Sequence, residues 1–359
     1  MKIFIQLPAH LSINEWKKKF DKDQILGIND SESPYGYARL NNKGHTVEFS
    51  DSPRNMIICK IIRKLLGFDL FNVLRFRNKI FKSDIVWTHT EVEFLAVSFL
   101  LIFWKKDVKI LGQSVWLLDK WSKFSFLKKM IYLNLIKRVD ILTFHSILNS
   151  NLAKEKFYFS KEKIKVVKFG IPTEKMYPVK EKYIKEKYLN IVAIGNDIHR
   201  DWESLVEVCG GKSNVKLTII STTINHQIIG NYKNIEVRTF NNKKDFVEFV
   251  LKQDLSIVPL KDNLHASGLT AIQESIIFGI PVLCSNKGGL SNYFNNEVVT
   301  FYNNLDLADI IDQVHDNYNH YLRKASNAQE FLIKENINAN GYIDRQLELS
   351  KSLFNEAVI

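Results

Sequence analysis

Residues 265–283, HASGLTAIQESIIFGIPVL, predict one short amphipathic helix that leads into a buried strand. Ser267 is a candidate N-cap, Gly279 is a candidate C′ residue, and Pro281 prevents the helix from continuing. The predicted buried stripe has apolar residues at positions i, i+3 and i+7, which are Leu269, Ile272 and Ile276. A helix followed directly by an apolar strand is typical of an α/β domain.

The other face of this helix is polar. Thr270 and Glu274 lie one turn apart, and Ser267 precedes them at the end where the free backbone N–H groups favour a phosphate. Glu274 is about 5 Å further along the axis, an offset that suits the ribose hydroxyls of a nucleotide whose phosphates lie at the helix start. The alternative is a capped surface helix with a solvated glutamate, and the pattern alone favours the two interpretations equally.

The same alternation of short apolar strands and helical stretches extends along the whole chain. Strands apolar on both faces and separated by helices predict parallel sheets, and two successive series predict two doubly wound, Rossmann-like domains that face a central crevice. The predicted strands are 2–7, 45–50, 84–89, 108–113, 140–145 and 164–169, then 189–195, 215–221, 235–240, 255–260 and 280–285. We place the domain boundary near Pro172 and Pro178, with domains at 1–175 and 176–335 and a C-terminal helix at 336–359 that packs back towards the first domain.

Bulk composition narrows the class of protein. The 359 residues are 45% hydrophobic and 25% charged, as in a soluble globular protein. The three cysteines are far apart, which argues against a disulfide framework or a structural zinc site and favours a reducing compartment. The longest apolar run, 94–104, is too short to span a bilayer, and no signal peptide is visible, so we expect a cytoplasmic protein.

Charge is distributed unevenly. Residues 1–180 hold 32 Lys and Arg against 17 Asp and Glu, whereas the rest of the chain holds 18 against 22. Residues 54–82 alone carry eight basic residues and one acid, interleaved with large apolar side chains, and 104–109 and 120–132 repeat the pattern. This composition predicts a first domain that rests on the anionic inner face of a cell membrane as a peripheral protein. The alternative is a set of ordinary amphipathic helices whose basic residues face water.

Two further stretches place polar side chains after predicted strands. In 192–208, a strand ends at Gly195, and Arg200 follows in a loop from which an arginine can clamp a diphosphate. The alternative there is a surface pair of Arg200 with Asp201. His89 lies at the carboxyl end of another strand, where it can bind a sugar hydroxyl or assist proton movement.

Together these stretches resemble the family-4 glycosyltransferases, which have the GT-B fold. The similarity runs in order along residues 33–300: SPYGYARLNNKGHTVEF, IKVVKFGIPTEKMYP, AIGNDIHRDWESLVE, SGLTAIQESIIFGIPVL and the KGGL stretch at 287–290. The chain departs from the family where His265 stands near the usual first glutamate and Pro172 replaces the usual aspartate. The usual phosphate-binding lysine is best matched by Arg200 or Lys261.

The resemblance implies a metal-independent, retaining transfer of a hexose-type sugar from a nucleotide diphosphate sugar, with no further cofactor. On that basis the catalytic candidates are His89, Arg200 and Lys261. The candidate donor-binding residues are Gly195, Arg200, Lys261, His265, Ser267, Gly268, Leu269, Thr270 and Glu274. His89 would approach the sugar from the first domain, so that domain closure completes the site. The implied acceptor is a lipid-linked saccharide in bacterial surface polysaccharide synthesis.

Other functions compete with this interpretation. A nucleic-acid-binding protein would also combine basic and aromatic residues, but it leaves the acidic half and the helix at 265–283 unexplained, so we expect no nucleic acid partner. A catalytically degenerate GT-B scaffold and a GT-B sugar-nucleotide epimerase are further alternatives. Asp21-Lys22-Asp23 has the DxD form of some metal sites, but it lies within a charged run and we predict no metal there.

Overall fold

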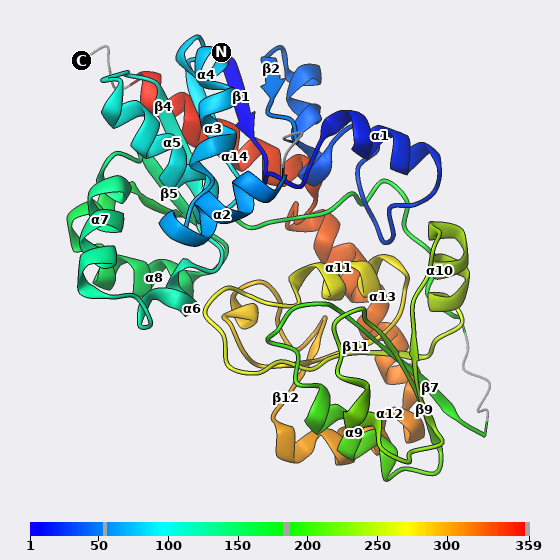
Figure 1. The fold of residues 1–359 in the computed structure, drawn as a ribbon. Coiled ribbons are helices and arrows are strands. Elements are labelled where there is room, and N and C mark those ends of the chain that lie inside the picture. Colours follow the sequence, from blue (N-terminus) through cyan, green and yellow to red (C-terminus); the bar gives the residue numbers. More distant parts are fainter. Residues whose placement is uncertain (53–55, 182–186, 356–359) are drawn as a thin grey trace. The chain divides into compact units, whose positions relative to one another are not determined.

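Two compact units, each built on a six-stranded parallel sheet, make up the protein (Figure 1). The computed structural model describes residues 1–52, 56–181 and 187–355. Unit 1 consists of Met1–Asp21, Asp30–Phe169 and Ala339–Ile359, and unit 2 consists of Lys22–Asn29 and Gly170–Asn338.

The sheet of unit 1 has the order β2-β1-β3-β4-β5-β6. Its strands are β1 (Lys2–Gln6), β2 (Thr46–Phe49), β3 (Ile85–Thr88), β4 (Lys109–Gln113), β5 (Ile141–Phe144) and β6 (Ile164–Val166). Its helices are α1 (Ile13–Asp21), η1 (Pro34–Lys43), α2 (Met56–Leu66), α3 (Leu70–Arg75), α4 (Arg77–Phe81), α5 (Glu91–Phe103), α6 (Leu117–Trp121), α7 (Phe126–Lys137), α8 (Ile147–Lys156), η2 (Tyr158–Lys163) and α14 (Ala339–Asn355).

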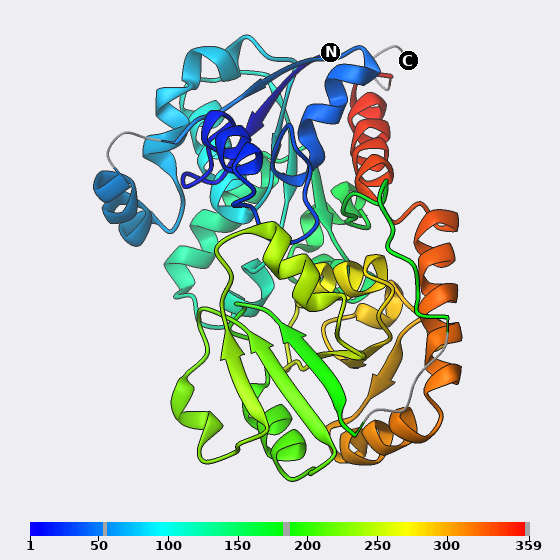
Figure 2. The same cartoon turned by 90° about the vertical axis from the view of Figure 1, so that its right-hand side faces the viewer.

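The sheet of unit 2 has the order β12-β11-β10-β7-β8-β9, and Figure 2 shows β7, β8 and β9 side by side. Its strands are β7 (Leu189–Ile194), β8 (Val215–Ile220), β9 (Ile235–Arg238), β10 (Leu255–Val258), β11 (Val282–Ser285) and β12 (Thr300–Tyr302). Its helices are α9 (Trp202–Gly210), η3 (His226–Ile229), α10 (Lys243–Val250), α11 (Leu269–Ile277), η4 (Leu290–Asn292), η5 (Asn304–Asp306), α12 (Leu307–Asp316) and α13 (Tyr318–Lys334).

The strand orders locate the switch points at which open α/β sheets generally bind ligands. In unit 2 the order corresponds to the Rossmann arrangement, with the switch point between β7 and β10. In unit 1 the first strands follow the flavodoxin-like arrangement, with the switch point between β1 and β3. In sheets of these orders, the loops that follow the two strands at a switch point diverge to opposite faces, and a ligand crevice is expected there.

The predicted fold class of two doubly wound α/β domains is confirmed, and all the predicted strands are present, most of them shorter by one or two residues. The sequence reasoning did not find β12, a three-residue edge strand that is too short to show a pattern. Within the described residues, no helix combines the length and the apolarity that crossing a membrane requires.

The C-terminal helix α14 belongs to unit 1. Trp87 Nε1 in β3 donates to Ser350 Oγ at 2.9 Å, and Tyr342 Oη donates to Gln113 Oε1 at 2.6 Å. All four side chains are buried, so these hydrogen bonds tie the end of the chain to the centre of the first sheet. Residues 356–359 of the predicted segment lie outside the described residues.

Candidate functional site

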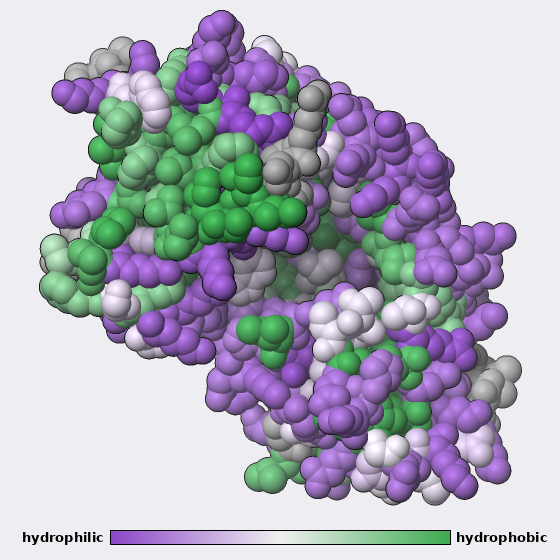
Figure 3. Space-filling view, in the orientation of Figure 1, coloured by the Kyte–Doolittle hydropathy of each residue, from purple (hydrophilic) through white to green (hydrophobic). Residues whose placement is uncertain are grey.

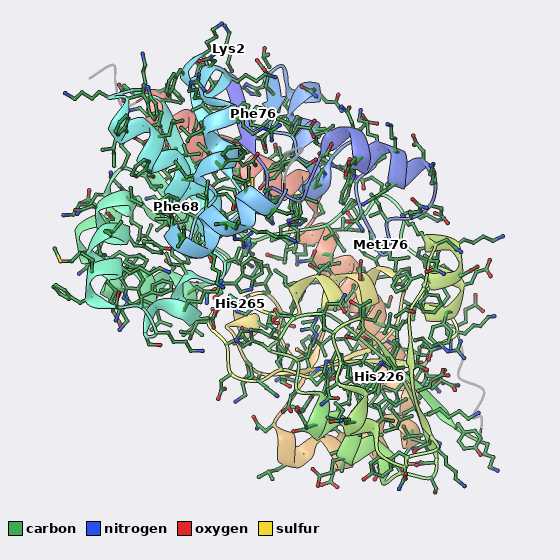
Figure 4. The ribbon with its side chains drawn as sticks, in the orientation of Figure 1. Lys2, Phe68, Phe76, Met176, His226 and His265 are labelled. Atoms are coloured by element: carbon green, nitrogen blue, oxygen red, sulfur yellow. The ribbon has the colours of Figure 1, made fainter. Side chains whose placement is uncertain are left out.

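The switch point of unit 2 brings together the loops that follow β7 and β10. Gly195 to Arg200 follow β7, and Leu260 to Gly268 follow β10. An antiparallel backbone bridge between Arg200 and Leu260 joins the two loops. His265, labelled in Figure 4, lies on the loop that leads from β10 into α11. Most of the predicted donor-binding residues therefore gather at one end of one sheet.

A pocket of about 200 Å³ opens beside these loops, within unit 2. Its walls come from the carboxyl ends of three adjacent strands, β7, β8 and β9, and from the side chains of Phe246 and Glu274. Leu26 and Gly27, in the short segment that unit 2 takes from the N-terminal part of the chain, complete the lining. Apolar side chains such as Phe240 and Phe246 share the lining with polar residues that include Arg238 and Glu274, and this mixture suits an amphiphilic ligand such as a nucleoside.

Glu274 is the acidic group of this pocket. Its residue is only 7% exposed, and Oε1 accepts a hydrogen bond from the Ile28 N–H at 2.8 Å. Burial raises its pKa to about 7, although the Ile28 N–H and the charge of Lys243 act in the opposite direction. The alternative of a solvated glutamate is therefore wrong, because packing of α11 between β10, β11 and the 22–29 segment removes Glu274 from water.

Residues 22–29 are held against the rest of unit 2 by backbone and side-chain hydrogen bonds. Asp23 accepts from the N–H groups of Lys243 at 2.7 Å and Lys244 at 2.8 Å, at the start of α10. At Gly27, where φ is +77°, a Cβ atom would collide with the Glu274 carboxylate. The sequence reasoning treated 21–23 as a solvated run, and Asp21 and Lys22 are indeed exposed, whereas Asp23 is half-buried and bonded to α10. It did not foresee that residues 22–29 leave unit 1.

Arg200 is a buried cation, with 6% of its surface exposed. Its guanidinium donates to Ser267 Oγ at 3.3 Å and to the Ile194 carbonyl at 3.2 Å. Within the described residues, its Nε has no hydrogen-bond partner. Burial lowers the pKa of Arg200 and the charge of Asp197 raises it, but an arginine stays charged at neutral pH. The predicted alternative of an Arg200–Asp201 surface pair is wrong, because Arg200 points inward.

Two glycines make room for this guanidinium. A Cβ atom on Gly195 would overlap the guanidinium, and one on Gly268 would lie 3.2 Å from it and 2.6 Å from Val258 Cγ1. Gly268 also has φ of +87° and is the N-cap of α11. The prediction that Ser267 caps this helix is wrong: Ser267 Oγ instead donates to Asp197 at 2.8 Å and accepts from Arg200.

Asp197 is a site residue that the sequence reasoning missed. Its Oδ2 lies 2.9 Å from His265 Nε2 and accepts from Ser267, and its Oδ1 accepts from the His199 N–H at 3.0 Å. Burial acts to raise the pKa of Asp197, but the hydrogen bonds from His265, His199 and Ser267 hold it well below its usual range. The signal was present, because Asp197 follows the same strand end as Arg200.

The remaining predicted donor residues are placed as follows. Thr270 is exposed and Leu269 is buried in the first turn of α11, where the backbone N–H groups have no acceptor within the helix. Lys261 joins the site through its backbone, which donates to the His199 carbonyl at 2.8 Å. Its half-exposed side chain instead pairs with Glu203 at 3.0 Å.

In unit 1, His89 follows the carboxyl end of β3. Its ring stacks on Tyr35 with centroids 3.4 Å apart, and its Nδ1 lies 3.0 Å from Tyr37 Oη. Burial lowers the pKa of His89 well below 6.5, helped by the charge of His145, so its imidazole is neutral. A neutral ring held on one face and at one nitrogen can exchange a hydrogen bond with a hydroxyl group through its Nε2.

Gln113 and His145, at the ends of β4 and β5, are further polar residues at this edge of unit 1 that sequence reasoning did not select. Gln113 Nε2 donates to the His89 carbonyl at 3.1 Å, and His145 Nδ1 lies 3.1 Å from the Val167 carbonyl. Both residues terminate strands that the sequence identified, so their position at strand ends was the available signal.

Similar solved structures place the fold in context. No protein-family model matches the chain, and no curated protein sequence matches it either. Anabaena Alr3699/HepE in complex with UDP-glucose is 12% identical, with a TM-score of 0.69 over 98% of this chain and 100% of that one. Sucrose-phosphate synthase from Thermosynechococcus elongatus is 12% identical, with a TM-score of 0.71 over 99% and 100%.

A third structure, the apo form of the lipopolysaccharide outer core galactosyltransferase WaaB, is 13% identical, with a TM-score of 0.58 over 98% and 99%. These similarities cover both units from end to end, and the first two have TM-scores near 0.7. The chain has the GT-B fold. At 12–13% identity the likeness concerns the fold, and the activity has to be argued from the site.

Proposed function

We propose that this protein is a glycosyltransferase that takes its sugar from a nucleotide diphosphate sugar. The observation that carries the proposal is that the loops and the helix at the carboxyl end of the unit 2 sheet hold both a buried carboxyl group, Glu274, and a buried cation, Arg200. Burying two ionisable side chains costs free energy. A nucleotide site would explain this cost, because Glu274 can accept hydrogen bonds from hydroxyl groups and Arg200 can donate them to phosphate oxygens. The UDP-glucose complex of HepE, which shares the fold, supports this choice of ligand class.

The donor binds with its nucleoside in the pocket of unit 2. A volume of about 200 Å³ is below the range of about 300–1,000 Å³ for whole drug-sized ligands, so it suits one part of a nucleotide. The Glu274 carboxylate accepts hydrogen bonds from the ribose hydroxyls, either together with the hydrogen bond from the Ile28 N–H or in its place. The diphosphate then meets the guanidinium of Arg200 and the free N–H groups at the start of α11.

Transfer breaks the bond between the anomeric carbon and the diphosphate oxygen and forms a bond to an acceptor oxygen. The acceptor's proton passes to the departing diphosphate on the same face of the sugar, which gives retention. Arg200 and the α11 N–H groups stabilise the charge that develops on the diphosphate, so we expect no metal requirement. His89 holds an acceptor or sugar hydroxyl through its neutral ring, and Lys261 contributes positive charge near the phosphates.

The acceptor is a lipid-linked saccharide, and unit 1 binds it at an anionic membrane surface. Large apolar side chains are exposed on α2, α5 and α7, and Figure 3 shows hydrophobic residues gathered over α2 and α5. The most exposed of them are Ile57, Ile61, Leu65, Phe103, Phe126 and Leu127. Soluble proteins seldom expose such faces without a partner. Arg54 and Asn55, in the basic segment named from sequence, lie outside the described residues.

This arrangement fits an enzyme of bacterial surface polysaccharide synthesis that works in the cytoplasm on the inner face of the membrane. The similarity in fold to a lipopolysaccharide galactosyltransferase supports the acceptor class. Nucleic acid is the less favoured partner, because the two buried charges of unit 2 have no role in binding it.

A ligand screen tests the proposal. Thermal unfolding is followed with uridine, guanosine and adenosine diphosphates and their sugars, in wild type and in Arg200→Met, whose apolar side chain fills the space. A ligand present at 100 times its Kd stabilises by about 2.7 kcal/mol, which is easily measured. We expect one nucleotide series to stabilise the wild type and not the variant. A chain that binds RNA and none of these nucleotides would contradict the proposal.

A further inference from the structure

A second pocket, of about 440 Å³, lies within unit 1 among α2, α5, α6 and α7. Five basic side chains line it, and the only acidic side chain among its lining residues is that of Glu91. The basic residues are Lys60, Arg63, Lys64, Lys120 and Lys128. None of the residues that we assign to donor binding lines this pocket. Its lining residue Glu91 follows His89 by two positions, just beyond the carboxyl end of β3.

The positive charges of this pocket are poorly neutralised by the protein itself. Arg63 reaches Asp69 only at 3.9 Å, and Lys120 reaches Glu91 only at 3.8 Å. Across the described chain, Lys60 and Lys64 have no carboxylate within ion-pair distance. Lys128 lies over the ring of Phe124 at 4.5 Å instead. Cations that converge from three helices repel one another in a pocket without a ligand, so they favour the binding of a multiply charged anion.

The neighbourhood of Glu91 adds an independent observation. Glu91 Oε2 accepts from the N–H groups of Val115 and Trp116, both at 3.2 Å, whereas its Oε1 is buried with no hydrogen bond in the part of the chain that is described. A buried oxygen without a donor is costly, and a hydroxyl group of a ligand would satisfy it. An anion flanked by hydroxyls is the chemistry of a sugar attached to a phosphate.

The pocket is bordered by apolar surface. On α2, Ile61 and Leu65 are 55% and 78% exposed, and on α7, Phe126 and Leu127 are 78% and 66% exposed. Both helices also supply the cations, so a ligand whose phosphates enter the pocket would lay any attached chain along these apolar faces. A free anion would use the cations and leave this surface in water, which favours an amphiphile over a soluble phosphate.

We infer that this pocket binds the phosphate-bearing headgroup of a lipid, a prenyl-type diphosphate that carries the acceptor saccharide. The inference deepens the proposed function, since it names the chemical class of the acceptor and the residues that hold its phosphates. Lys60, Lys64, Lys120 and Lys128 contact the phosphate oxygens, and Glu91 Oε1 accepts a hydroxyl of the first sugar. The lipid chain enters the membrane between α2 and α7.

Vesicle co-sedimentation of the full chain, without any donor nucleotide, tests this inference. Three vesicle types are compared at one ionic strength: phosphatidylcholine alone, phosphatidylcholine with phosphatidylglycerol, and phosphatidylcholine with a prenyl diphosphate at the same negative charge. Simple surface attraction would give equal binding to both anionic vesicles. We expect binding to the prenyl diphosphate vesicles to be at least about tenfold tighter, because only this headgroup carries adjacent phosphates for converging cations.

Matched charge variants locate the effect. Lys64→Gln with Lys120→Gln removes two cations of the pocket, and Lys123→Gln with Lys129→Gln removes two from the same region outside the lining residues. We expect the first pair to abolish the preference for prenyl diphosphate, with a loss of roughly fivefold for each lysine. The second pair should weaken both anionic vesicles equally and keep the preference. Equal behaviour of the two pairs would overturn the inference.

Two further measurements distinguish a lipid headgroup from a free anion, and distinguish this inference from the proposed transferase function. Inorganic diphosphate should compete only weakly, and competition as strong as that of the vesicles would show a site for a free anion instead. The Lys64→Gln, Lys120→Gln chain should keep the wild-type thermal shift with nucleotides, since unit 2 is unchanged. A protein that prefers prenyl diphosphate but binds no nucleotide would retain this site and lose the proposed transferase function.

Discussion

Replacing Glu274 with glutamine removes a charge from the pocket of unit 2 without changing its shape. The amide oxygen can still accept the hydrogen bond from Ile28, so the 22–29 segment stays in place. What changes is the free energy of ionisation. Burial raises the pKa of Glu274 from 4.5 to about 7, and each pKa unit corresponds to about 1.4 kcal/mol. The folded protein therefore loses about 3 kcal/mol as the pH rises through this range.

The sign follows from where the proton is held more tightly. The folded state keeps the Glu274 proton up to a pH of about 7, whereas the unfolded chain releases it near 4.5. The contribution of the Glu274 proton to wild-type stability is thus fully present below pH 4.5 and is lost as the pH rises through 7. Glu274→Gln should be as stable as wild type at pH 4.5 and more stable at pH 8, with unit 2 unfolding roughly 10 °C higher. Glu330→Gln, an exposed glutamate of the same unit, serves as the control and should change neither value.

Ligand binding should move in the opposite direction from stability. A ribose diol prefers the ionised carboxylate, so wild-type affinity for a nucleotide sugar should be about tenfold higher at pH 8 than at pH 6. UDP-glucose is the suitable probe, because its diphosphate has no terminal phosphate group, whose pKa near 6 would add its own pH dependence. Glu274→Gln should bind it about 10- to 100-fold more weakly at pH 8, without this pH dependence.

Calorimetric titration at the two pH values, combined with thermal unfolding, decides the matter. A variant that gains stability at pH 8 and loses affinity has the behaviour of a binding carboxylate. A variant that keeps wild-type affinity and its pH dependence would refute our assignment of Glu274 to the ribose, whatever its stability.

Three other predictions follow from single contacts. Gly195→Ala adds a Cβ atom that overlaps the guanidinium of Arg200, so UDP-glucose affinity should fall about tenfold. Gly211→Ala, whose Cβ would make only ordinary contacts at 3.7 Å and beyond, should leave the affinity unchanged, and equal effects of both variants in calorimetry would contradict the role of Arg200. Because burial lowers the pKa of His89 well below 6.5, its ring proton resonances in NMR should show no titration between pH 6 and 8, and a midpoint in that range would contradict its neutral state. Trp87→Phe removes the 2.9 Å hydrogen bond to Ser350 and leaves the buried Ser350 hydroxyl with one partner fewer. The free energy of unfolding of unit 1, measured by denaturant titration, should therefore drop by about 1–3 kcal/mol. An unchanged midpoint would show that α14 does not depend on this bond.

The fold could be predicted because local patterns and the final structure agree. Apolar strands such as IVWT in β3 and LSIV in β10 are buried on both faces, which is typical of a parallel sheet with helices on both sides. The stop signals at Gly279 and Pro281 also depend on local backbone geometry, and Gly279 has φ of +71° as predicted. β12 escaped notice because three residues at a sheet edge carry no period.

The wrong predictions about side chains concern contacts between distant parts of the chain. Ser267 has the composition of an N-cap, but Asp197 and Arg200, about 70 residues away, compete for its hydroxyl group. Arg200 has a neighbouring acid in sequence, yet the bridge to Leu260 turns it inward. In both cases the local preference amounts to about 1 kcal/mol, and a buried network of charged hydrogen bonds outweighs it.

The sequence by itself determined the alternation of strands and helices, the positions of the polar residues at strand ends, and the excess of positive charge in the first half. These properties follow from side chains within a few residues of one another, so no partner is needed to reveal them. Only the tertiary structure decided that residues 22–29 join unit 2 and that Glu274 is buried against Ile28. It also gathered lysines from α2, α6 and α7 around one pocket. Burial and convergence depend on which surfaces meet when the chain folds, and it is burial that gives Glu274 and Arg200 the properties a binding site requires.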